Sequence, residues 1–417
     1  MYTLELEAIS QIIGLDGYTN IVVDKFLKEN ELSDFRKRLF TKIVYGVVEN
    51  KIYLDYQLKF YLENKEVKSV FKNLLRMGVY MIFMMDIKNY HVVSEIVEMA
   101  KKRDYRASKM VNAVLREMLR QGLKEIPTAD KCTYLSIKYS YPINLVKCLN
   151  KMYPDEIEAI LEPAGESLNS YRINNHLMKS EEVAAILKKE EIPFKIKGAF
   201  LSTSKNLLQH ELFKKGIITF QDYASQKVGI IMNPKPNEKI LDVCSAPGSK
   251  TCHLASLMND TGLVTACDIH KHKLLLIEEN VKKQHLHNVE VCLNDGAKAP
   301  FKKNDEIVLF DQVLVDAPCS GLGVMKHKVD LKYHITMNKL RELVTLQAEI
   351  LSNSAKNVKI GGFLTYSTCT INKEENKAQI ARFLSHHANF KEVMIESTLP
   401  INNEEDGFFI CKMERVK

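Results

Sequence analysis

The stretch that most constrains the fold is residues 239–250, which read Lys-Ile-Leu-Asp-Val-Cys-Ser-Ala-Pro-Gly-Ser-Lys. The apolar run 239–243 is followed by Pro247 and Gly248, which predicts a short buried strand and then a tight turn. A helix is expected from about residue 251. A strand, a glycine turn and a helix form a nucleotide-type pocket at the strand's carboxyl end. Because a dinucleotide fingerprint needs three glycines and only Gly248 is present, we expect a smaller ligand.

Four further apolar runs end in polar or reactive residues. They cover residues 263–268, 289–293, 312–315 and 362–366. With the first strand they predict an open α/β sheet whose ligand edge lies at the carboxyl ends of its strands. Asp268 ends the second run about twenty residues after the turn, the separation at which an acidic residue binds ribose hydroxyls. We therefore take Asp268 as the ribose-binding candidate.

Three short motifs carry a resemblance to a known family. Residues 245–248 (Ser-Ala-Pro-Gly), 316–320 (Asp-Ala-Pro-Cys-Ser) and 367–370 (Ser-Thr-Cys-Thr) resemble the RNA cytosine-C5 methyltransferases that use S-adenosylmethionine. Residues 34–50, 95–101 and 111–116 resemble the NusB-like helical domain of one bacterial subfamily, the RsmB (Sun) type, which modifies small-subunit ribosomal RNA. The resemblance covers nearly the whole chain.

The resemblance and the helical patterns together predict three domains in the 417 residues. Residues 1–127 are expected to form an all-α NusB-like domain, because apolar residues recur at helical spacing, as at Phe35, Phe40 and Val44. Residues 128–215 are expected to form a small α+β module. Residues 216–417 are expected to form a Rossmann-like methyltransferase domain.

Composition narrows the class of protein. Nine cysteines, an odd number without a C-x-x-C pair, favour a reducing compartment and argue against disulfides and zinc. The most apolar segment, 79–85, is too short to span a membrane. We therefore expect a cytoplasmic protein with no membrane association, no metal and a monomeric state. The net charge of +7 is compatible with RNA, but it is also common in proteins that bind no nucleic acid.

The cysteines of two motifs carry the expected chemistry. Cytosine C5 is too weak a nucleophile to take a methyl group directly, and addition of a thiolate to C6 activates it. The resemblance implies that Cys369 attacks C6 and that Cys319 assists product release; the related DNA enzymes have the reverse assignment, which stays open. Asp316 is a candidate to hydrogen-bond the cytosine. The other cysteines are read as buried apolar residues, apart from Cys244 in the turn.

The resemblance also implies the residues that hold S-adenosylmethionine. The turn would hold the methionine end through backbone groups, Asp295 would meet the adenine amine, and Asp316 would also touch the cofactor. Lys250 is expected to pair with a carboxylate or to shape the pocket. The expected cofactor-binding residues are Cys244, Ser245, Ala246, Pro247, Gly248, Ser249, Lys250, Asp268, Asp295 and Asp316.

RNA contacts are expected at Arg172 and Asn174 in the small module, with a surface pair as the alternative, and at Lys326, where the family usually has arginine. The target base must be unstacked, in a single-stranded loop or flipped out of a helix. The leading hypothesis is formation of 5-methylcytosine in 16S ribosomal RNA during rRNA processing. The alternatives are a transfer RNA substrate and a non-catalytic RNA-binding ribosome assembly factor.

Overall fold

The structure is a computed structural model that describes residues 2–15, 17–62, 66–85, 87–163, 165, 168–401 and 405–417. The chain divides into two compact units. We call Met1–Pro163 together with Met325–Ile335 the helical unit, and Ala164–Val324 together with Thr336–Lys417 the sheet unit. Each unit is described by itself.

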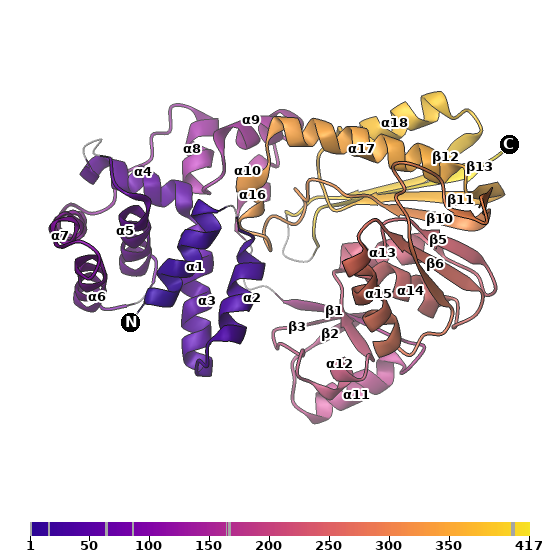
Figure 1. Cartoon of the computed structure of the whole chain (residues 1–417), viewed down its shortest axis with the longest axis horizontal. Coiled ribbons are helices and arrows are strands. Elements are labelled where there is room, and N and C mark those ends of the chain that lie inside the picture. Colours follow the sequence, from indigo (N-terminus) through magenta and orange to yellow (C-terminus); the bar gives the residue numbers. More distant parts are fainter. Residues whose placement is uncertain are drawn as a thin grey trace. The chain divides into compact units, whose positions relative to one another are not determined.

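The helical unit consists of helices joined by short turns (Figure 1). Side-chain caps begin three of them: Ser33 accepts a hydrogen bond from the Arg36 amide, Asp104 from the amides of Arg106 and Ala107, and Asp130 from the Thr133 amide. The helices are α1 (Thr3–Gly14), α2 (Thr19–Glu29), α3 (Asp34–Glu49), α4 (Lys51–Leu62), α5 (Ser69–Phe83), α6 (Asn89–Lys101), α7 (Tyr105–Gln121), α8 (Lys131–Lys138), α9 (Ile143–Met152), α10 (Ile157–Leu161) and α16 (Leu331–His334).

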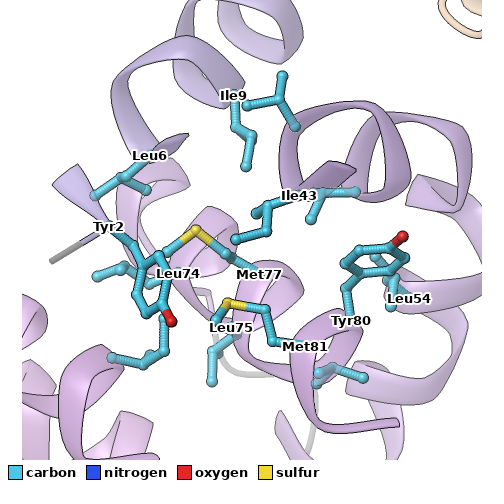
Figure 2. Packing of buried hydrophobic residues seen from close by; sticks show 14 of the residues in the cluster. Tyr2, Leu6, Ile9, Ile43, Leu54, Leu74, Leu75, Met77, Tyr80 and Met81 are labelled. Carbon is cyan, nitrogen blue, oxygen red and sulfur yellow. The ribbon is translucent and has the colours of Figure 1, made fainter. Parts of the chain in front are cut away.

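The predicted apolar stripes form the core of this unit. Figure 2 shows Ile43 of α3 among Leu74, Met77 and Met81 of α5, all of which are buried. The stripe prediction is confirmed for α3 except at its first member, because Phe35 is 74% exposed at the start of the helix. Close packing of this kind excludes water and leaves little room for added atoms.

One glycine in this core is fixed by a close approach between helices. A Cβ atom added to Gly46 of α3 would lie 2.0 Å from the Tyr80 ring of α5. Tyr80 is 8% exposed, so its ring cannot swing into solvent without opening the core. We expect Gly46→Ala to lower the free energy of unfolding by about 1–3 kcal/mol, as overpacking does elsewhere.

Chemical denaturation measures this effect, and Gly14→Ala in α1 is the matched control, since an added Cβ there meets nothing within 4 Å. The control is expected to leave stability unchanged or slightly raised, because alanine favours helix over glycine. Equal stability of the two variants would contradict the packing argument.

The helical unit extends beyond the predicted boundary at residue 127. Helices α8, α9 and α10 group with it, and so does the distant segment Met325–Ile335. Within that segment Lys332 is 2% exposed and donates to the Glu49 carbonyl at 2.8 Å, and the Tyr333 hydroxyl donates to the Val48 carbonyl at 2.9 Å. The segment after the Pro-Cys motif is therefore anchored in helical structure.

The sheet unit contains two main sheets, which have the predicted α/β character. The smaller one has the order β2-β3-β1-β4 and is antiparallel. Its elements are β1 (Asn169–Ile173), β2 (Lys195–Lys197), β3 (Phe200–Thr203) and β4 (Ile218–Phe220), with α11 (Ser180–Lys189) and α12 (Glu211–Lys214).

The larger sheet has seven strands in the order β12-β13-β11-β10-β5-β6-β7. Strands β11, β10, β5, β6 and β7 are parallel, and β13 and β12 add antiparallel at one edge. The strands are β5 (Lys239–Asp242), β6 (Leu263–Asp268), β7 (Val289–Leu293), β10 (Phe310–Asp316), β11 (Val358–Thr368), β12 (Phe390–Thr398) and β13 (Phe408–Arg415), with a short hairpin of β8 (Lys302–Lys303) and β9 (Glu306–Ile307). All five predicted strands are present, and two match to the residue.

Helices cover both faces of the larger sheet (Figure 1). One face packs against α13 (Tyr223–Met232), α14 (Ser249–Leu257) and α15 (Lys271–Lys283), and the other against α17 (Met337–Ala355) and α18 (Lys377–His386). The strand order reverses between β5 and β10, so their carboxyl ends form the topological switch point at which such sheets bind ligands.

In the part of the chain that the structure describes, no helix combines the length and the apolar character needed to cross a membrane.

Candidate active site

Hydrogen bonds hold the turn after β5 in place. The amide and the hydroxyl of Ser245 both donate to the Cys267 carbonyl at 2.8 Å, which joins the turn to β6. Gly248 has φ of +102° and donates its amide to the Ser245 carbonyl at 2.7 Å. A side chain at Gly248 would be strained at this φ and would bring a Cβ within 3.2 Å of Ile277. The turn therefore requires glycine at this position.

Two of the predicted carboxylates lie at the ends of adjacent strands. Asp268 ends β6, is 7% exposed, and accepts the His270 amide at 2.9 Å through Oδ1. Asp295 follows β7, accepts the Ala297 amide at 3.2 Å and lies 3.3 Å from the Lys298 ammonium. The Asn294 amide donates to the Asp268 carbonyl, so the two strand ends are joined.

A third carboxylate, Asp242, lies beneath the turn. It is fully buried and accepts the Thr251 hydroxyl at 2.7 Å through Oδ2, while no partner for Oδ1 is found among the described residues. Burial raises the pKa of Asp242 to about 7, against the opposing effect of the Thr251 hydrogen bond. Asp242 therefore binds a proton far more readily than an exposed aspartate.

The two motif cysteines face one another. Strands β10 and β11 are parallel neighbours with Asp316 opposite Ser367, and the loops that follow them bring Cys319 Sγ and Cys369 Sγ to 3.4 Å. Neither cysteine is part of a disulfide, and both are partly buried. The adjacent Cys369, together with burial and the charge of Glu375, raises the pKa of Cys319 well above its ordinary value. Cys319 is therefore a neutral thiol at neutral pH.

Lys250 and Asp316 form an ion pair at the same edge of the sheet. The Lys250 ammonium lies 2.8 Å from Asp316 Oδ2, and the Ser367 hydroxyl donates to Oδ1 at 2.8 Å. Burial alone would lower the pKa of Lys250, but its interactions with Asp316 and Cys369 outweigh burial and raise it. A cation that interacts with a cysteine favours the thiolate, so the charge of Lys250 would favour the thiolate form of Cys369.

The structure corrects the prediction that Arg172 and Asn174 contact RNA. Arg172 is 1% exposed and donates to Gln221 at 2.8 Å and to Gln284 at 2.7 Å, and burial lowers its pKa to about 10. Asn174 is fully buried and accepts the Ser256 hydroxyl at 2.6 Å. Both residues join the smaller sheet to the helices of the larger one, inside the sheet unit.

The third residue expected at RNA, Lys326, belongs to the helical unit, where its ammonium donates to the Ala159 carbonyl at 3.3 Å. An RNA contact by Lys326 stays a prediction.

Three residues of the site were missed by reasoning from the sequence. Asp242 and Ser367 lie inside quoted motifs, and only the structure shows that they contact Thr251 and Asp316. Glu375 follows Cys369 by six residues in a polar run, which predicts a solvated loop, yet it is fully buried. A charged residue is almost never placed in the interior from sequence alone.

Comparisons with known proteins identify the family to which the chain is similar. The model of the family 16S rRNA methyltransferase RsmB/F matches residues 229–414, and that of the NusB family matches residues 3–120. The probable ribosomal RNA small subunit methyltransferase B of Bacillus subtilis (strain 168) is 34% identical over 99% of this chain and 98% of its own. A protein of the same description from Synechocystis is 31% identical over 96% of both chains.

The chain belongs to the RsmB/F family of 16S rRNA methyltransferases. Its NusB-like domain is thereby confirmed, and so is the Rossmann-like class of its sheet unit. The solved structure of PH0851 is similar over 98% of this chain and 97% of its own, with 25% identity and a TM-score of 0.82. The structure of NSun6 from Pyrococcus horikoshii with SFG covers 66% of this chain at 20% identity and a TM-score of 0.60, which shows the shared fold.

The RsmB/F family uses S-adenosylmethionine, and the residues present fit this cofactor. The turn that requires Gly248 follows β5 at the topological switch point, where such sheets bind their ligands. Carboxylates at adjacent strand ends suit ribose hydroxyls and an adenine amine. The residues that would hold it are the turn residues 244–250 with Asp268, Asp295 and Asp316, and this assignment stays a prediction.

Asp268→Asn tests this placement. Replacing one carboxylate oxygen by an amide turns an acceptor for a ribose hydroxyl into a donor, so we expect S-adenosylmethionine affinity to fall by about tenfold or more. Isothermal titration calorimetry measures the change. Asp305→Asn is the matched control, because Asp305 is exposed in the β8–β9 hairpin. Equal affinity of the two variants would contradict the ribose assignment.

Proposed function

We propose that this protein transfers a methyl group from S-adenosylmethionine to cytosine C5 of 16S ribosomal RNA through a covalent adduct between Cys369 and cytosine C6. The observation that carries the proposal is the 3.4 Å separation of the Cys319 and Cys369 sulfur atoms, beside the Lys250–Asp316 ion pair. A methyltransferase acting on a small molecule has no use for two facing cysteines and an added helical domain.

The reaction follows from the groups that meet at this edge. The Cys369 thiolate adds to C6, and the electron pair released onto C5 makes that carbon a nucleophile. S-adenosylmethionine, when bound, would supply the methyl group on a sulfonium. C5 would attack that methyl carbon, and S-adenosylhomocysteine would leave as a neutral thioether. A base then removes the C5 proton, and the Cys369–C6 bond breaks to restore the aromatic ring and the thiolate. Asp316 is the carboxyl group available to accept a hydrogen bond from the cytosine amine and, in its protonated form, to donate one to N3 as charge develops there.

The charge state of Cys319 supports this division of roles. The largest contribution to its raised pKa is the neighbouring Cys369. Once Cys369 is bonded to cytosine it no longer carries a negative charge, so Cys319 becomes easier to ionise. Cys319 thus stays protonated during attack and becomes able to accept the C5 proton afterwards. The reverse assignment lacks this sequence of events, because Lys250 interacts with Cys369.

The substrate class is supported by the relatives. The proteins from Bacillus subtilis and Synechocystis are both described as acting on small-subunit ribosomal RNA, and each matches along almost its whole length. We therefore place 16S ribosomal RNA ahead of transfer RNA and ahead of a role in assembly without catalysis. The target cytosine must be single-stranded or flipped to reach the two cysteines.

Labelled methyl transfer to unmodified 16S RNA tests the proposal. We expect wild type to label cytosine C5, Cys369→Ala to label nothing, and Cys319→Ala to accumulate a protein–RNA adduct that survives denaturation. Cys132→Ala is the control and should behave as wild type, because Cys132 lies in α8 of the helical unit.

Other outcomes have definite meanings. An adduct that accumulates with Cys369→Ala would reverse the cysteine roles. Labelling of transfer RNA alone would change the substrate but leave the chemistry. RNA binding by wild type without any labelling would favour the assembly factor.

A further inference from the structure

Glu375 is a fully buried carboxylate surrounded by hydrogen-bond donors. Its Oε1 atom accepts the Ser320 hydroxyl at 2.5 Å and the Asn372 side-chain amide at 2.9 Å. Its Oε2 atom accepts the Ser320 backbone amide and the Gln347 side-chain amide, each at 2.9 Å. Among the described residues no ion pair with Glu375 is found, so these donors stabilise a buried charge.

The donors come from α17 and from the two loops that follow β10 and β11 and carry Cys319 and Cys369. Ser320 follows Cys319, and Asn372 lies on the loop that follows Cys369. Gln347 of α17 also donates to the Pro318 carbonyl at 2.9 Å, one residue before Cys319. The hydroxyls of Ser320 and Thr370, each directly after a cysteine, lie 2.7 Å apart. Glu375 is the point at which both loops are joined.

The hydrogen-bond donors around residue 375 require a carboxylate at this position. All five groups directed at the side chain donate, the fifth being the Thr370 hydroxyl at 3.5 Å from Oε1, and an ionised carboxylate has about four acceptor sites. The amide of glutamine would direct its own donors at two of these groups and leave them without an acceptor. An unsatisfied buried donor is costly enough to shift a loop.

We propose that Glu375 is a positioning residue of the reaction, which fixes the distance between Cys319 and Cys369 by hydrogen bonds to the loops that carry them. The expected effect on the rate of methyl transfer rests on the proposed function, whereas the effect on the distance between the two cysteines does not. A shift of the loops by about 1 Å is enough to cost catalysis on the order of 100-fold. The negative charge of Glu375 also contributes to the raised pKa of Cys319.

Glu375→Gln tests the proposal, and Glu374→Gln is the matched control, since Glu374 is the adjacent glutamate and its side chain is 67% exposed. Bridging of the two thiols by phenylarsine oxide, which requires closely spaced sulfur atoms, reads their distance without any methyl transfer. The pH dependence of alkylation by iodoacetamide, resolved by peptide mass spectrometry, reads the ionisation of Cys319.

We expect Glu375→Gln to weaken arsenical bridging and to move the alkylation midpoint of Cys319 to lower pH by about one unit, because a negative neighbour is removed. In methyl transfer, kcat is expected to fall about 100-fold with an unchanged KM for S-adenosylmethionine. Glu374→Gln is expected to match wild type in every measurement. Wild-type bridging together with a wild-type alkylation profile in Glu375→Gln would overturn the proposal.

Two further results keep the test decisive. If circular dichroism shows that Glu375→Gln does not fold, Asn372→Ala replaces it. This variant removes one donor to Glu375 and the acceptor for the Glu374 amide. Weaker arsenical bridging is expected, and bridging as in wild type overturns the proposal. If wild type methylates no RNA, the proposed function fails, and the thiol measurements still decide the role of Glu375.

Discussion

The site depends on the pairing of two parallel strands. Strands β10 and β11 lie side by side with Asp316 opposite Ser367, and hydrogen bonds between neighbouring backbones fix that register. A slip of one residue would turn either strand end to the other face of the sheet. The loops that leave these strands then carry Cys319 and Cys369 to 3.4 Å from one another. The proposed chemistry depends on this register, because it needs both cysteines at one site.

Buried charges complete the site around this pair. The Lys250 cation interacts electrostatically with both Asp316 and Cys369. The negative charge of Glu375 acts on Cys319. The two cysteines therefore have opposite surroundings: a cation favours the thiolate at one, and an anion favours the thiol at the other. Such interactions are strong because the groups are shielded from water. A difference in environment between two chemically identical groups is a recurrent way to divide catalytic roles.

Much of this arrangement could be predicted from the sequence, and the failures have physical reasons. The strands were found because apolar runs with polar or glycine-proline ends mark buried parallel strands, as for residues 263–268 and 289–293, which match β6 and β7. Arg172 was placed at the surface because arginine is rarely buried, and its glutamine partners lie 49 and 112 residues away. Glu375 was missed for the same reason. The anchoring of Met325–Ile335 in the helical unit is a long-range contact without a local signal.

The most direct test of the central claim is to identify the cysteine that bonds to the base. RNA containing 5-fluorocytidine at the target carries a fluorine that cannot leave C5 as a proton does, so the covalent intermediate should persist after methyl transfer. Digestion and tandem mass spectrometry of the trapped wild-type complex would then locate the nucleotide on the protein. The account predicts that the modified peptide carries the base on Cys369. A base found on Cys319, or the absence of any trapped peptide from a fully methylating enzyme, would contradict it.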